Sequence, residues 1–225
     1  MPRGAKWWPG EGSHLLMSNL WTRRLLSVSS PSLSTGGPQT MGSGRLFSEL
    51  AALLSERNGF YAFESALHVF GSGSDETIGG SVERWNALDG WISQYDGLAD
   101  GLAFFAEDIF GTQFAIRDEQ ILTFDPETGA TRKLAPSIDD WSHQLMSNFE
   151  YLTGHPVARR WQLMFGPLIP GNRLVPKTPF ALGGEFEPSN LESVAASEGM
   201  RERARLAVAT RDVPDGSTIR WRRTR

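Results

Sequence analysis

The feature that most constrains the fold is a β-hairpin signal in the middle of the chain. Two short apolar runs, Ile121–Phe124 and Ala130–Leu134, flank the turn sequence Asp125-Pro126-Glu127-Thr128-Gly129. Proline suits an early turn position because its φ angle is fixed, and glycine suits the left-handed position that closes the turn. We therefore expect two antiparallel strands joined by this turn.

The preceding stretch, Phe104–Ile116, indicates two more strands. Its apolar residues are mostly aromatic and surround Glu107-Asp108 and Gly111. This arrangement is typical of two strands joined by a tight, acidic turn region. Together with the hairpin that follows, it predicts at least four antiparallel strands.

Helical periodicity occurs on both sides of this β-rich region. We expect helices over 46–54, at the start of 60–70, over 85–95, 138–151 and 155–165, and from Ser189 or Asn190 to about Thr210, with a last strand at 218–221. Ser137 is the expected N-cap of the helix over 138–151. The pattern predicts an α+β fold with a central, mostly antiparallel sheet of about four to six strands flanked by helices.

Residues 1–41 differ in character from the remainder of the chain. They are rich in Gly, Pro and Ser, and only Leu15–Leu26 has the spacing of a short amphipathic helix. A transit peptide has a similar composition, whereas Met41 as the natural start would make the upstream residues a non-native extension. We favour the second interpretation, expect disorder over residues 1–41, and assign residues 42–222 to a single domain.

The composition excludes several classes of protein. The chain has no cysteine, so it has no disulfides, thiolate metal ligands or cysteine nucleophile. No apolar run approaches the length needed to span a bilayer. We therefore expect a soluble, cytoplasmic protein in a reducing compartment.

Charge is distributed unevenly along the chain. Residues 75–140 contain 14 acidic and four basic residues, although the whole chain has a net charge of only -4. An acidic body disfavours general nucleic-acid binding and could steer a basic partner, although acidic residues also simply keep a protein soluble. Residues 201–225 contain eight Arg, but Glu198 and Glu202 favour a solvated helix with salt bridges over a nucleic-acid contact.

Several segments together resemble a known family. They are Phe104-Phe-Ala-Glu-Asp-Ile-Phe-Gly111, the strand Gln113-Phe-Ala-Ile116, the hairpin at 125–129, the helix around Trp141, and, more loosely, 58–64 and 176–180. In this order they resemble the SUKH superfamily, the bacterial relatives of a yeast cell-wall-assembly regulator (Smi/Knr-like). The resemblance implies an α+β fold with a central sheet. Many bacterial members are immunity proteins that neutralise a toxin, often a nuclease or deaminase, and others are regulatory modules.

The pair Glu107-Asp108 is the strongest candidate for chemistry. Neighbouring carboxylates with separated pKa values could serve a small hydrolase or a sugar-binding enzyme. Adjacent residues of a strand point to opposite faces, however, so a shared site would need a bulge or turn. We favour a structural role in which one carboxylate accepts N–H hydrogen bonds and fixes the turn before Gly111.

No other catalytic constellation is present in the sequence. The four histidines lack the spacing of metal ligands, and no nucleophile elbow occurs. These are His14, His68, His143 and His155. We assign no catalytic residue, no metal and no cofactor.

We therefore expect a non-enzymatic protein-binding module, an immunity protein that occludes a basic toxin or nuclease domain; a regulatory scaffold is the other non-enzymatic alternative. The expected contact surface is acidic. It comprises Asp89, Asp96, Asp100, Glu107, Asp108 and Glu119. The Pro-rich segment 166–188 is an alternative surface. Aromatic anchors could contribute, although the helical spacing of Trp85, Trp91, Tyr95 and Trp141 favours the core. We expect neither membrane nor specific nucleic-acid binding.

Overall fold

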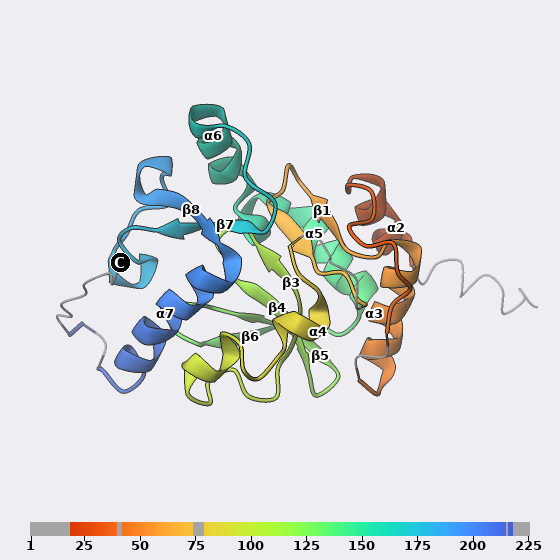
Figure 1. Ribbon diagram of the computed structural model, residues 1–225, viewed down its shortest axis with the longest axis horizontal. Coiled ribbons are helices and arrows are strands. Elements are labelled where there is room, and N and C mark those ends of the chain that lie inside the picture. Colours follow the sequence, from red (N-terminus) through yellow and green to blue (C-terminus); the bar gives the residue numbers. More distant parts are fainter. Residues whose placement is uncertain (1–18, 40–41, 74–78, 215, 218–225) are drawn as a thin grey trace, which may run out of the picture.

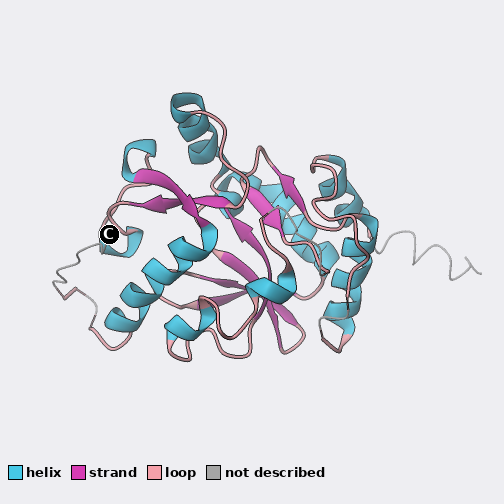
Figure 2. Cartoon of the chain, in the orientation of Figure 1, coloured by secondary structure: helices cyan, strands magenta, loops and turns pink. Residues whose placement is uncertain are grey.

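A computed structural model describes residues 19–39, 42–73, 79–214 and 216–217. Its centre is a six-stranded antiparallel sheet in which every strand lies beside its neighbours in sequence. The strands are β1 (Phe60–Ala62), β2 (Leu67–Val69), β3 (Ala103–Asp108), β4 (Gln113–Arg117), β5 (Gln120–Phe124) and β6 (Thr131–Ala135). The expected α+β fold, the two strands within 104–116 and the hairpin after them are thus confirmed (Figure 2).

Both faces of the sheet are covered, which explains the continuous apolar sequence of its central strands. Phe104 and Phe105 are both fully buried, and they belong to core clusters on opposite faces. A register shift between Phe104 and Ala106 marks a bulge in β3. The polar residues further along β3 therefore lie just beyond this irregularity.

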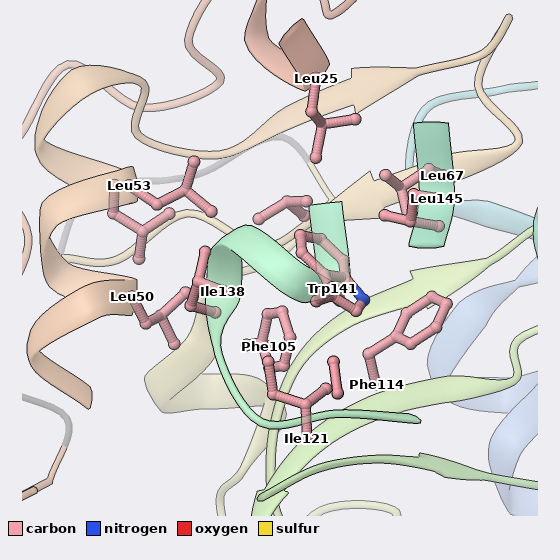
Figure 3. Packing of buried hydrophobic residues seen from close by; sticks show 14 of the residues in the cluster. Leu25, Leu50, Leu53, Leu67, Phe105, Phe114, Ile121, Ile138, Trp141 and Leu145 are labelled. Atoms are coloured by element: carbon pink, nitrogen blue, oxygen red, sulfur yellow. The ribbon is translucent and has the colours of Figure 1, made fainter. Parts of the chain in front are cut away.

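One face packs against three helices, α2 (Leu20–Ser27), α3 (Arg45–Glu56) and α5 (Ile138–Thr153). Trp141 of α5 is fully buried, and its ring meets those of Phe105 and Phe114 edge-on at centroid distances of 5.1 and 5.6 Å. Figure 3 shows these rings pointing into the layer between helix and sheet. As expected, Ser137 caps α5, its side chain accepting the N–H of Asp140.

The other face carries α4 (Val82–Trp85), the 3-10 turn η1 (Ile92–Tyr95) and α7 (Ala196–Thr210). In Figure 1 α4 and α7 lie in front of the sheet and α5 lies behind it. Trp91 and Tyr95 pack against each other edge-on, with ring centroids 5.5 Å apart. Trp85, Trp91, Tyr95 and Trp141 are all buried, so the prediction that they belong to the core is confirmed.

A third group of elements covers one end of the sheet. It comprises α6 (His155–Phe165), β7 (Asn172–Pro176), β8 (Leu191–Ala195) and the short turns η2 (Phe180–Leu182) and η3 (Pro188–Asn190). β7 and β8 form a separate two-stranded antiparallel sheet. The helix expected over 155–165 has the bounds that the sequence predicted. Among the described helices, none combines the length and apolar character that crossing a bilayer requires.

Three expected helices differ in the structure. Residues 60–70 form the β1–β2 hairpin, because Phe63, Glu64 and Ser65 all adopt positive φ angles that turn the chain without a glycine. The helix expected over 85–95 is split, since the side chain of Asn86 hydrogen-bonds both the N–H and the carbonyl of Phe104 at the edge of β3. The last helix begins only at Ala196, because residues 191–195 pair with β7. The strand expected at 218–221 lies outside the described residues.

The expected disorder before residue 42 is wrong for residues 19–39. Leu25 of α2 is fully buried in the core, and Asp139 of α5 accepts hydrogen bonds from the backbone N–H and the hydroxyl of Thr22. The chain then runs beside β1, where Ser30 donates its N–H to the carbonyl of Tyr61. The folded domain therefore begins before residue 42.

Candidate functional site

A row of polar side chains crosses four strands on the face of the sheet that carries α4 and α7, where Gln113 accepts the indole N–H of Trp85. Tyr61 of β1 pairs with His68 of β2, His68 with Glu107 of β3, and Glu107 with Gln113 of β4. His68, Glu107 and Gln113 are fully buried. Because side chains directly opposite each other on a sheet lie in contact, this register places a carboxylate between an imidazole and an amide.

Arg173 of β7 reaches this row from the small sheet. Its Nε lies 2.9 Å from Glu107 Oε1, a contact that is an ion pair without the alignment of a hydrogen bond. The same carboxylate oxygen lies 3.2 Å from His68 Nδ1, and Oε2 accepts Gln113 Nε2 at 3.2 Å. Burial alone would raise the pKa of Glu107, but Arg173, His68 and Gln113 together hold that pKa below its usual value.

His68 is neutral in this environment. Burial lowers its pKa to about 4, and the nearby Arg173 charge acts in the same direction. A neutral His68 donates Nδ1–H to Glu107, and its Nε2 has no hydrogen-bond partner among the described residues. The ring of Tyr61 stacks on it, and Gly79 passes so close that a Cβ atom there would lie 2.9 Å from Nε2. The row is thus enclosed.

Asp108 stabilises a turn of the backbone, whereas Glu107 contacts other side chains. Its Oδ1 accepts the backbone N–H groups of Phe110 and Thr112, each at 2.8 Å, and so fixes the turn between β3 and β4. Burial raises the pKa of Asp108 to about 7. Gly111 in this turn has a φ of 79°, and a side chain there would collide with Arg203 of α7. The expected structural role of one carboxylate before Gly111 is confirmed.

Glu107 and Asp108 are therefore not surface residues, and their expected place in an acidic contact surface is wrong. They are 0% and 6% exposed, since consecutive strand residues here point into two different buried environments. Two hollows in the structure are lined by other residues. The hydrolase alternative, which needs both carboxylates in one accessible pocket, has no support from this geometry.

The remaining acidic candidates lie on the surface. Asp89, Asp96 and Asp100 are exposed in the segment around η1, and Glu119 is exposed in the turn between β4 and β5. Asp96 binds Arg211 at 2.7 Å, and Glu119 lies 3.6 Å from Arg45. The structure brings the three aspartates into one loop region but leaves Glu119 on a separate turn.

Arg203 corrects the expectation that the C-terminal arginines all lie on a solvated face. It is only 3% exposed, and its guanidinium donates to the carbonyl oxygens of Gly199 and Phe110.

Within the part of the chain that the structure describes, no group of three or more His, Asp or Glu side chains could hold a metal ion.

Sequence reasoning missed a group of exposed apolar side chains at the end of α6. Leu163, Met164 and Phe165 at the end of α6 are 76%, 64% and 56% exposed, and Ile169 in the following loop is 63% exposed. We call these four residues the α6 surface. A helix buries only one stripe, so three consecutive apolar residues cannot all face its core. The run Leu163-Met164-Phe165 in the sequence therefore indicates that at least one of these apolar side chains is exposed.

A hollow adjoins the α6 surface. Its volume is about 350 Å³, and its floor lies between α6 and η3. It is lined by Arg160, Leu163, Met164, Glu187, Pro188 and Ser189. Of the residues that line the hollow, Glu187 and Pro188 belong to the Pro-rich segment 166–188 that the sequence left open as an alternative surface.

No protein-family model matches this sequence, and no curated protein matches it.

Proposed function

We propose that this chain is a non-enzymatic protein-binding module and that the α6 surface is its main contact. The observation that carries this proposal is the concentration of exposed apolar side chains at the end of α6, where four large residues are each more than half exposed. Contiguous apolar surface costs free energy in water and marks protein contacts when polar residues surround it. Arg159 and Arg160 supply such a polar rim.

The alternative of a carboxylate-dependent enzyme is less well supported. The Glu107 carboxylate contacts Arg173, His68 and Gln113. The Asp108 carboxylate accepts hydrogen bonds from backbone N–H groups. A catalytic carboxylate needs to reach a proton of the substrate within hydrogen-bond distance. Neither side chain is accessible to a substrate in this conformation.

Affinity purification of the full chain from its native cells tests the proposal. The informative variant is Leu163→Asp, which puts a charge on the most exposed residue of the α6 surface, and the matched control is Leu88→Asp. Leu88 is 79% exposed but lies in the loop before η1, far along the chain from α6. We expect the wild type and the Leu88 variant to retain the same protein and the Leu163 variant to lose it. Equal retention by all three would contradict the proposal.

The exposed acidic segment around η1 is favoured as a second contact surface for a protein partner. Asp96 presents a carboxylate that is 73% exposed and already binds the guanidinium of Arg211 at 2.7 Å. Asp89 and Asp100 are exposed in the same segment. A basic protein, such as a nuclease domain neutralised by occlusion, could place its own cations there, with long-range attraction accelerating association.

The salt dependence of binding tests this second contact. For a candidate toxin encoded beside the chain, the triple variant Asp89→Asn/Asp96→Asn/Asp100→Asn should associate at least about 10-fold more slowly than the wild type at low salt, with the difference shrinking as salt rises. Glu56→Gln, which removes an exposed charge at the end of α3, is the control. An unchanged association rate for the triple variant would rule out this contact.

A further inference from the structure

We infer that the attachment of β7 to the six-stranded sheet is sensitive to acid, so that protonation of His68 releases β7 and β8 while the six-stranded sheet stays folded. This regulatory device is separate from the α6 surface and does not depend on what that surface binds. Two observations carry the inference. Two basic side chains share one buried carboxylate oxygen, and few backbone bonds hold β7 in place.

His68 and Arg173 contact the same oxygen of Glu107. His68 Nδ1 lies 3.2 Å and Arg173 Nε lies 2.9 Å from Glu107 Oε1, although the two basic residues belong to different sheets. All three side chains are at most 1% exposed. A neutral imidazole and a guanidinium can share this oxygen, whereas two buried cations beside one carboxylate leave a positive charge that is neither paired nor hydrated. A protonated His68 and a docked Arg173 therefore disfavour each other.

The surroundings of His68 offer no partner for a second proton. The titratable side chains that face it are Tyr61 of β1, Glu107 of β3 and Arg173 of β7. Tyr61 stays neutral, since burial raises its pKa. The second proton would join Nε2, which has no hydrogen-bond partner among the described residues and lies against Gly79. Burial and the Arg173 charge both oppose protonation while β7 is docked, and together they lower the pKa of His68 to about 4.

Release of β7 removes this opposition. It withdraws the charge of Arg173 and admits water to His68 from the side that β7 covered. Glu107 stays in place, because β2 and β3 belong to one ladder in which His68 lies opposite Glu107. The imidazolium then keeps its counter-charge and becomes hydrated, so the pKa of His68 returns to at least its ordinary value of 6.5. Protonation thus favours the released state, as buried histidines do in pH sensors.

The backbone attachment of β7 is weak compared with the ladders of the six-stranded sheet. Figure 1 shows β7 and β8 as a separate ribbon near the end of β3. Among the described residues, one backbone hydrogen bond joins them to that region, from the Leu174 N–H to the carbonyl of Ile109 at 2.8 Å. Neighbouring strands of the large sheet pair over three to five residues each. Segments with few long-range bonds open at a lower free energy than the core, so β7 opens before the sheet.

Hydrogen exchange of backbone amides in the purified full chain tests the inference. The Leu174 N–H reports on β7, and the amides of β4 and β5 report on the sheet. A pKa of 6.5 in the released state and of about 4 in the docked state raises the equilibrium constant for opening about 20-fold between about pH 7 and about pH 5. The protection factor of Leu174 should fall by that factor and stay at least about 10-fold below those of β4 and β5. A protection factor that does not change with pH, or that equals those of β4 and β5, would overturn the inference.

Two variants identify the titrating group. His68→Gln keeps a donor for Glu107 but takes up no proton, so the protection of Leu174 should change by less than about 2-fold over the same range. Asp108→Asn is the matched control, because Asp108 is buried on the same strand as Glu107 but binds the turn at Phe110. It should keep the wild-type response. A response that persists in His68→Gln would overturn the inference. The wild-type measurement can also overturn it alone, so the test does not depend on the folding of either variant.

Discussion

Arg173 of the small sheet and Glu107 of the large sheet form a buried ion pair, with Nε and Oε1 2.9 Å apart and both side chains only 1% exposed. Placing two charges inside a protein costs desolvation energy that their attraction only partly offsets. The pair therefore fixes the position of β7 on the large sheet and contributes little to net stability. A second contact attaches the loop between α6 and β7, which carries Ile169, to the large sheet, because Gly171 donates its N–H to the hydroxyl oxygen of Tyr61.

Breaking one side of this pair should be strongly destabilising. Glu107→Gln leaves the Arg173 guanidinium buried without a counter-charge, and we expect the free energy of unfolding to fall by about 3–5 kcal/mol. The double variant Glu107→Leu/Arg173→Met should recover much of that loss, because both charges are gone. Urea denaturation of the single and double variants measures the coupling. A single variant that costs less than about 1 kcal/mol would show that the pair is not desolvated as described.

His68 should make the protein sensitive to acid. Its folded pKa of about 4 lies below the ordinary histidine pKa of 6.5, so the unfolded chain binds more protons between these values and stability falls as pH drops through this window. The full effect is about 3 kcal/mol, since one pKa unit corresponds to about 1.4 kcal/mol. Glu107, whose pKa is also lowered, acts in the same direction. His68→Gln should flatten the dependence of unfolding free energy on pH between 4 and 6.5, and an unchanged slope would contradict the assignment.

Asp108 should act in the opposite direction. Its folded pKa of about 7 lies above the ordinary aspartate pKa of 3.8, so the folded chain binds more protons within this window and stability falls as pH rises through it. Asp108→Asn keeps an oxygen acceptor for the N–H groups of Phe110 and Thr112 but removes the titration. The variant should therefore gain stability relative to wild type as pH rises from about 4 to 7. Equal pH profiles for the two proteins would show that Asp108 keeps an ordinary pKa.

The segment before residue 42 should prove necessary for stability. Leu25 is fully buried, so Leu25→Ala should cost about 2–5 kcal/mol, whereas Leu20→Ala, at a side chain that is 41% exposed, should change stability by less than about 0.5 kcal/mol. A chain that begins at Met41 should be less stable than one that begins at Asn19, because it lacks α2. Thermal melts of these proteins provide the comparison. Equal melting temperatures for the two truncated chains would contradict the packing of α2 on α5.

The parts of the fold that the sequence predicted are those with strong local signals. The turn at 125–129, the two strands within 104–116 and the capping by Ser137 each depend on neighbouring residues, and the structure confirms all three. The β1–β2 hairpin was missed because its turn uses Phe63, Glu64 and Ser65 at positive φ, where glycine or asparagine would be expected.

The candidate sites were harder to predict, because they depend on contacts between distant segments. No local pattern indicates that Arg173 enters the core beside Glu107, or that Arg203 binds the turn at Phe110. The sequence therefore suggested an exposed acidic pair where the structure has two enclosed carboxylates. The α6 surface was detectable, since Leu163, Met164 and Phe165 exceed what one buried stripe of a helix can hold.

Photo-cross-linking in the native cell tests the central claim, that the α6 surface is a protein contact, most directly. A photoreactive phenylalanine derivative would replace Phe165, which is 56% exposed, and in a control protein would replace Leu88, which is 79% exposed. We predict a discrete cross-linked species from position 165, either a dimer of this chain or a complex with another protein, and none from position 88. Position 165 giving no more product than position 88 would contradict it.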